Sequence, residues 1–153
     1  MEDKGHTRDS KTLAKRGHDD SFVLEKSIFS NIFDKDIRRI YIYKKAERLA
    51  RALHLITPAF SKSDTLKTRI DELTLGLIDG AVLPIREAKN QLSRELLSLS
   101  SLLSLARTSG LLSAMNADLI AHESQTLLEE IASYEEPRLA LESAPSLAGL
   151  SKD

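Results

Sequence analysis

The chain has 153 residues, of which 41% are hydrophobic and 29% are charged, and its net charge is −1 at pH 7. These values suit a single globular domain with a sizeable core, and they argue against wholesale disorder or a fibrous protein. The absence of cysteine excludes a disulfide framework, a thiolate nucleophile and metal sites with sulfur ligands.

The two ends of the chain differ in composition from its middle. Residues 1–20 carry mixed charges and hardly any large apolar side chain, so we expect a disordered tail. Residues 136–153 are interpreted as a second, flexible tail. The first residues lack an apolar core before a cleavage site, which predicts a cytoplasmic location. The longest uncharged run, Leu96 to Ala106, is too short to span a bilayer, so no membrane association is expected.

Residues 21–135 are predicted to form one helical domain. A segment from Ser21 to Phe33, rich in phenylalanine, is too short to be a stable helix alone and should dock on another surface. A long helix then begins at Asp34 or Asp36 and ends at Pro58. Its apolar residues recur at steps of four and three, which places them on one face. This seam consists of Ile42, Ala46, Leu49, Leu53 and Ile56.

Caps and prolines delimit two further helices. The second long helix starts where Ser61 and Asp64 have the spacing of a capping box, and it ends before Pro84. The third begins directly after that proline and ends at Gly110, which is expected to be a left-handed C-cap.

The fourth long helix is predicted to start near Ser113 or Asn116 and to stop before Pro137. Its apolar residues are Leu119, Ile120, Leu127, Leu128, Ile131 and Tyr134. Four helices of similar length joined by short turns favour antiparallel neighbours, and no segment alternates like a strand. The predicted fold is therefore all-α: an antiparallel four-helix bundle with a short extra N-terminal helix and flexible termini.

Charge is unevenly distributed, with a net +4 over residues 34–57 and −6 over residues 110–153. Basic side chains and one tyrosine form a stripe on the first long helix that could follow the phosphates of RNA or DNA. The alternatives are a solvated face, an acidic protein partner, or internal pairing with Glu123, Glu129 or Glu130. The stripe consists of Tyr41, Lys44, Lys45, Arg48 and Arg51.

The third long helix has an unusual face opposite its apolar seam, with no charge between Glu95 and Arg107. Small uncharged residues let another helix approach closely, so this face is predicted to be a homo-oligomer interface or to be covered by the chain's own terminal segments. The face consists of Ser93, Leu97, Ser100, Ser101 and Ser104. We expect Phe22, Phe29 and Phe33 of the N-terminal segment to join the same interface.

Catalytic chemistry finds little support in the sequence. Asp118 and His122 lie one helical turn apart and could begin a metal site or an acid–base pair. The Glu-x-x-His pairs of a di-iron bundle, the phosphate-binding loop and the nucleophile elbow are all missing from the sequence. We therefore expect no enzyme activity, no cofactor and no metal.

The segment Tyr43-Lys44-Lys45-Ala46, the following ERLARALHLI, the turn with Pro58 and then LKTRIDELTLGLIDGAV resemble the four-helix-bundle family of ribosomal-RNA intervening-sequence proteins. The accessory proteins of diversity-generating retroelements belong to the same group. The resemblance covers residues 43–135 and implies a pentameric barrel of bundles whose basic surface engages nucleic acid and partner proteins. Lys44, Lys45, Arg48 and Arg51 would carry that role.

The sequence thus leads to two functional hypotheses. The first is a non-enzymatic interaction or scaffold protein that self-associates through the third long helix. The alternative is a nucleic-acid-binding accessory protein that uses the basic stripe.

Overall fold

The computed structural model describes residues 24–136, and every regular element in this part of the chain is a helix. This confirms the predicted all-α class. The chain divides into two compact units, Met1–Ile40 and Tyr41–Asp153. Within residues 24–136, no helix combines the length and the apolar character that crossing a bilayer requires.

In the first unit, a helix whose described part comprises residues 24–33 is followed by a tight corner. Asp34 and Lys35 both adopt left-handed backbone conformations, with φ of 47° and 62°. The N–H of Asp34 donates to the Ser30 carbonyl at 3.2 Å, and the N–H of Asp36 donates to the Phe33 carbonyl at 2.9 Å. These bonds satisfy carbonyls that the end of a helix leaves open, so the corner terminates this helix and leads directly into the next.

Helix α2 (Ile37–Ile56) begins directly after Asp36, the second of the two predicted starting positions. Asp36 Oδ1 accepts the backbone N–H groups of Arg38 and Arg39 at 3.1 and 3.4 Å, which satisfies free donors of the first turn. From residue 41 onward α2 belongs to the second unit. There its predicted seam is buried in the core, with Ile56 packed at the edge.

The short helix η1 (Thr57–Phe60) connects α2 to α3 (Asp64–Ala81). Ser63 caps α3, because its backbone is extended and its Oγ accepts a backbone N–H of the first turn at 3.4 Å. The prediction that Ser61 caps this helix was wrong. Ser61 keeps a helical backbone conformation, and its N–H donates to the Pro58 carbonyl at 3.2 Å. A residue that still continues the preceding turn cannot adopt the extended conformation that an N-cap needs.

Helix α4 (Ile85–Thr108) ends as predicted at Gly110, whose φ is 71°. The N–H of Gly110 donates to the Arg107 carbonyl at 3.1 Å, and the N–H of Leu111 donates to the Ala106 carbonyl at 2.9 Å. This pair of bonds is a Schellman motif. It ends α4 sharply and turns the chain toward the next helix.

Helix α5 (Ala114–Ser133) begins after Ser113, whose Oγ accepts the N–H of Asn116 at 3.2 Å. Of the six apolar residues that marked this helix in the sequence, only Leu119 and Leu128 are exposed. The other four lie in the core of the second unit: Ile120, Leu127, Ile131 and Tyr134.

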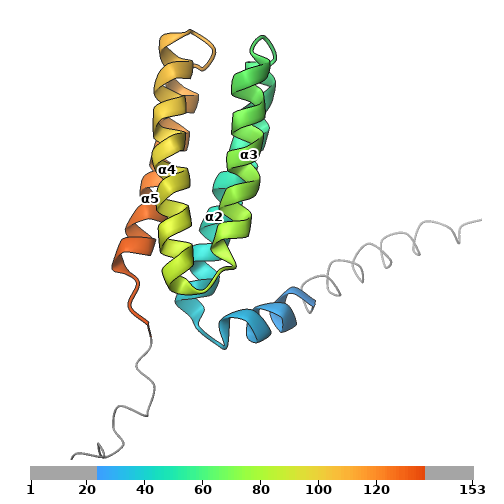
Figure 1. The fold of residues 1–153 in the computed structure, drawn as a ribbon, viewed down its shortest axis with the longest axis vertical. Coiled ribbons are helices and arrows are strands. Elements are labelled where there is room, and N and C mark those ends of the chain that lie inside the picture. The colour runs from blue at the N-terminus through green and yellow to red at the C-terminus, as the bar shows by residue number, and fades with distance from the viewer. Residues whose placement is uncertain (1–23, 137–153) are drawn as a thin grey trace, which may run out of the picture. The chain divides into compact units, whose positions relative to one another are not determined.

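The second unit is held together by one cluster of apolar side chains from α2, η1, α3, α4 and α5. Helix α4 packs against α3 on one side and against α5 on the other. Gly80 is buried where α3 meets α4, and a Cβ added there would lie 3.3 Å from the Leu92 side chain, so these two helices approach closely. Figure 1 shows the helices side by side, with consecutive connections at alternate ends.

Candidate functional site

The basic stripe of α2 is exposed, but its cations already contact groups of the same unit. Arg48 Nη2 lies 3.1 Å from Glu123 Oε1 of α5, so the pairing of this stripe with the acidic last helix is confirmed at Glu123. The Arg48 side chain is 72% exposed, whereas that of Glu123 is only 10% exposed. The arginine therefore neutralises a carboxylate that is nearly out of contact with water.

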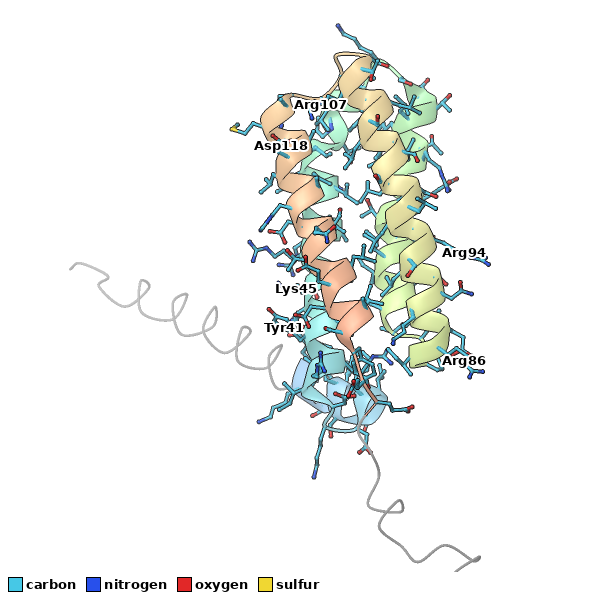
Figure 2. All side chains as sticks on the ribbon, turned by 90° about the vertical axis from the view of Figure 1, so that its left-hand side faces the viewer. Tyr41, Lys45, Arg86, Arg94, Arg107 and Asp118 are labelled. Carbon is cyan, nitrogen blue, oxygen red and sulfur yellow. The ribbon has the colours of Figure 1, made fainter. Side chains whose placement is uncertain are left out.

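The remaining cations of the stripe have partners within α2 itself. Glu47 accepts Arg51 Nη2 at 2.5 Å and lies 3.9 Å from Lys44 Nζ. Lys45 Nζ sits 4.9 Å from the centre of the exposed Tyr41 ring (Figure 2). Any nucleic acid that used this stripe would have to compete with these contacts for the positive charge.

The uncharged face of α4 forms one wall of a groove of about 600 Å³, and α5 forms the other. Ser93, Leu97, Ser100 and Ser104 line it, whereas Ser101, also predicted for this face, is exposed outside the lining. On the α5 side the smaller lining residues are Ala117, Ala121 and Ser124, with Asp118, Gln125 and Leu128 beside them.

Two walls with the same spacing make this groove regular. Ser93, Leu97, Ser100 and Ser104 follow one another at steps of four, three and four residues, and so do Ala117, Ala121, Ser124 and Leu128. Such steps keep side chains on one face of each helix, and small side chains let a third helix come close. The α5 wall escaped the sequence analysis, although the repeated spacing of small residues was a signal that could have revealed it.

The groove is nearly free of charge. Among the described residues that line it, only Arg107 and Asp118 are ionised, and they lie at one end with Nη1 and Oδ1 3.7 Å apart (Figure 2). Leu97 is 70% exposed, and Leu128 is exposed on the opposite wall. The Ser124 hydroxyl donates to the Ile120 carbonyl of its own helix at 2.7 Å. A surface of this kind suits large apolar side chains of a partner helix.

The Phe-rich segment contributes differently from what its composition suggests. Phe29 and Phe33 pack against each other with ring centres 5.9 Å apart, and the Arg39 guanidinium lies 5.1 Å from the Phe33 ring centre. Phe33 is buried, so its ring is already used within the chain. Phe22 and the terminal segments proposed as covers for α4 lie outside the described residues.

The exposed face of this N-terminal helix carries aliphatic residues that the sequence analysis did not single out. Leu24, Ile28 and Ile32 are exposed and follow one another at steps of four residues. We call these three residues the aliphatic stripe. The recurrence of apolar residues at every fourth position was a signal in the sequence that could have revealed this side of the helix.

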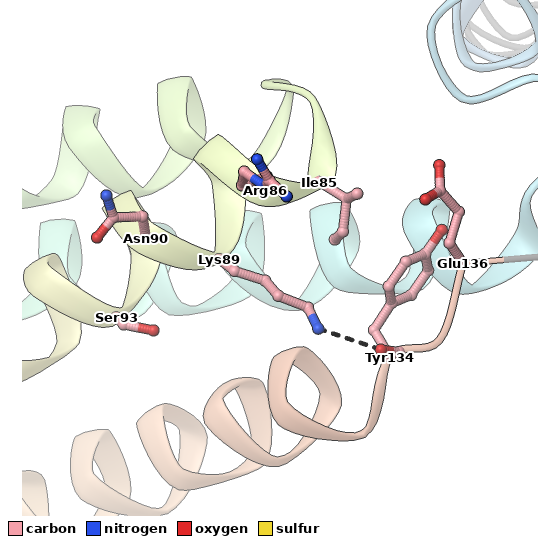
Figure 3. Close-up of a pocket in the computed structure, with 7 residues that line it drawn as sticks. All are labelled: Ile85, Arg86, Lys89, Asn90, Ser93, Tyr134 and Glu136. Carbon is pink, nitrogen blue, oxygen red and sulfur yellow. Dashed lines mark hydrogen bonds between the residues drawn. The ribbon is translucent and has the colours of Figure 1, made fainter.

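A second pocket, of about 540 Å³, lies where α4 begins and α5 ends, lined by Ile85, Arg86, Lys89, Asn90, Ser93, Tyr134 and Glu136. Figure 3 shows Lys89 Nζ donating to the Tyr134 carbonyl at 3.2 Å. The lysine thus satisfies the open end of α5, a structural role for the most enclosed cation of this pocket.

The structure places Asp118 and His122 on the exposed side of α5, with Asp118 beside Arg107. Residues 24–136 contain no cluster of three or more histidine or acidic side chains that could hold a metal ion. Comparisons with protein-family models, curated proteins and solved structures find no match for the chain. The resemblance to the intervening-sequence proteins therefore stays a prediction.

Proposed function

We propose that this protein is a non-enzymatic scaffold that self-associates, and that its long helices form an antiparallel four-helix bundle whose α4–α5 groove is the contact surface. The observation that carries the proposal is the groove itself. Two helices present small residues in matching steps, with exposed Leu97 between the serines and no charge along most of the length.

A groove of this length with charged side chains only at its end is unusual on the surface of a monomeric protein. Water-facing helices usually carry charged side chains, and an apolar strip rimmed by polar residues is typical of an interaction site. The ion pair of the groove lies at its end, so the lining residues along its length offer no charged group to fix a small ligand. A partner helix supplies the shape that such a groove fits.

The test is the solution mass of the purified protein, measured by light scattering over a range of concentrations. Wild-type protein should be a multimer, and Ser100→Glu with Ser104→Glu should dissociate it, because two carboxylates would have to be buried without partners. Ser101→Glu is the matched control for Ser100→Glu alone, since it adds the same single charge one residue away but outside the groove.

Circular dichroism should show the same helical signal for all these variants. A wild-type monomer at every concentration, or a folded Ser100/Ser104 variant with unchanged mass, would count against the proposal. Equal dissociation by Ser101→Glu would show that added charge anywhere on α4 is enough, and that the groove is not the contact.

A second candidate is nucleic-acid binding by the α2 stripe, favoured by the exposed Tyr41 ring with Lys45 beside it. Binding to a single-stranded RNA oligonucleotide at low salt should then weaken when Lys44 and Lys45 become alanine. Lys62 and Lys67, exposed away from the stripe, are the matched pair for control substitution. No binding at low salt, or equal loss in both pairs, would eliminate this candidate.

A further inference from the structure

The α4–α5 groove lies close to the point where the described part of the chain ends. Glu136, the last described residue, lines the pocket at the start of α4. Ser93 lines both this pocket and the groove, so the two adjoin. Glu136 and Ser93 lie at opposite ends of the pocket (Figure 3). A chain that continues from Glu136 therefore reaches the groove after passing a single pocket.

Residues 137–153, which we call the C-terminal segment, are long enough to follow this path. At the rise of a helix, Leu97 lies about 18 Å along α4 from Ile85, and Arg107 lies about 33 Å from it. The C-terminal segment spans about 25 Å as a helix and about 56 Å when extended. It thus reaches Leu97 in either conformation, and it reaches the far end of the groove when extended.

The charges of the C-terminal segment divide it into three parts. Arg138 and Glu142 are charged, and residues 143–151 that follow carry no charge. Lys152 and Asp153 are charged again. The uncharged part contains two leucines among small residues, so it can cover apolar surface without bringing a charge with it.

The path along α4 has the same three parts in the same order. The pocket at its start holds the cations Arg86 and Lys89. Among the described residues that line the groove beyond it, none is charged until Arg107 and Asp118 at the far end. With the C-terminal segment laid along this path, Glu142 meets the cations and the uncharged part covers the uncharged groove. No charge then has to be buried without a partner.

Covalent attachment favours the C-terminal segment of the same chain over that of a second copy. A segment joined to a site by a short linker meets that site at an effective concentration on the order of millimolar. The linker from Glu136 to residue 143 is short in this sense. A second copy in dilute solution is present at a far lower concentration, so the groove meets its own segment first.

We propose that residues 143–151 fold back into the α4–α5 groove of their own chain and thereby limit self-association. The contact itself does not depend on the proposed function, whereas its effect on self-association rests on it. A second copy can enter the groove only after the C-terminal segment has left. The apparent dissociation constant of the multimer is therefore the intrinsic constant divided by the fraction of uncovered grooves.

The contact is tested by disulfide trapping, because the chain has no cysteine that would compete with introduced ones. The groove pair is Ser100→Cys with Ser146→Cys, and the control pair is Leu75→Cys with Ser146→Cys. Leu75 is 64% exposed on α3, and its neighbour Gly76 lies against the Glu95 side chain of α4. The control position is thus nearer the start of α4 than Ser100 is, so reach along α4 does not favour the groove pair.

Mild oxidation at low protein concentration should close the disulfide within one chain at least about 10-fold faster in the groove pair than in the control pair. A non-reducing gel separates this product from a disulfide between two chains, which doubles the mass. Equal rates in the two pairs would overturn the inference and leave the proposed function untouched. Products mainly between chains would show that the segment enters a second copy, and the contact within one chain would be refuted.

The effect on self-association is tested with Leu147→Glu and Leu150→Glu in one chain. Two carboxylates in the uncharged part should keep it out of the groove, so the multimer should form about 10-fold more tightly by light scattering. Leu139→Glu with Leu141→Glu is the matched control, because it makes the same change in the charged part and should leave the dissociation constant unchanged.

The two tests separate this inference from the proposed function. An unchanged dissociation constant in the Leu147/Leu150 variant would overturn the limit on self-association, even with a fast disulfide in the groove pair. Monomers at every concentration in both the wild type and this variant would refute the proposed function, whereas a faster groove pair would still support the contact within one chain.

Discussion

The α2 stripe and the α4–α5 groove are two exposed surfaces of the same unit, and they differ in what their side chains already contact. The stripe is rich in charge, yet Glu47 and Glu123 accept three of its cations and Tyr41 takes the fourth. The groove is poor in charge, and Leu97 in it is 70% exposed. The α2 stripe, whose composition suggests binding, is therefore the surface whose side chains already have partners within the molecule.

This difference shows that the net charge of a helix does not tell how many of its charged groups are available to bind a partner. A carboxylate such as Glu123, nearly buried on α5, needs a cation more than a solvated phosphate does, because burial without a partner is costly. The positive charge of α2 is therefore partly a structural requirement of α5. The α4–α5 groove holds almost no charge, so its side chains are not needed to neutralise a buried group elsewhere in the unit.

The largest expected effect follows from reversing the charge at Arg48. Arg48→Glu should lower the free energy of unfolding by about 2 kcal/mol, because the nearly buried Glu123 would lose its cation and face a second carboxylate. Urea denaturation followed by circular dichroism measures the change.

The control for this prediction is Arg51→Glu, which reverses a charge one turn further along the same stripe. Its partner Glu47 lies on the same helix, where like charges at this spacing cost only about 0.5 kcal/mol. If both variants lost equal stability, the stripe would be an ordinary solvated face and the contrast between Arg48 and its neighbours would disappear.

A smaller effect concerns the turn that sets α4 beside α5 and so shapes the groove. Gly110→Ala should destabilise the fold by about 1 kcal/mol, because alanine disfavours the left-handed backbone although nothing lies within 4 Å of the added Cβ. Thermal or urea unfolding measures this loss.

Gly76→Ala provides the matched substitution with the opposite expected sign. Gly76 lies inside α3, and the atom nearest to an added Cβ is the flexible end of Glu95, at 2.7 Å. Alanine should therefore stabilise the helix by about 0.5 kcal/mol once Glu95 moves aside. A gain in stability at Gly110 would show that the turn does not depend on its left-handed residue.

The smallest expected effect is that of salt on self-association. Between about 50 and about 500 mM NaCl, the dissociation constant of the multimer should change less than about twofold, because the groove holds almost no charge. Binding of RNA through four cations would instead weaken on the order of several hundred-fold over this range. Sedimentation or light scattering at both salt concentrations separates the two surfaces, and a strongly salt-dependent mass would contradict the groove as the contact.

Helices and their buried seams were predictable from the sequence because the spacing of apolar residues within a single helix is enough to identify its buried face. Ile42 and Leu49, or Leu92 and Leu99, repeat on one face whatever packs against them, and all four are buried. Gly110 was equally readable, since few residues other than glycine suit a left-handed C-cap.

Features that depend on two elements at once were harder to predict. Pairing of Arg48 with Glu123 requires the axial register of α2 against α5, which neither helix encodes alone, so the sequence left three glutamates open. The α5 wall of the groove was missed for the same reason. The N-terminal helix has two apolar sides, and its own residues do not decide which one is buried; the structure buries Phe33 and exposes Ile28.

Ser124, which lines the groove from α5, lowers the free-energy cost of removing water from this surface. The hydroxyl of Ser124 is already bonded to the Ile120 carbonyl within its own helix, and this bond can remain when a partner covers the groove. Removing water from that hydroxyl therefore costs little free energy, since burial of a hydroxyl is unfavourable mainly when it has no hydrogen-bond partner. Water can therefore solvate this side of the groove in the free protein, and a partner that covered the groove would displace that water at little cost in free energy.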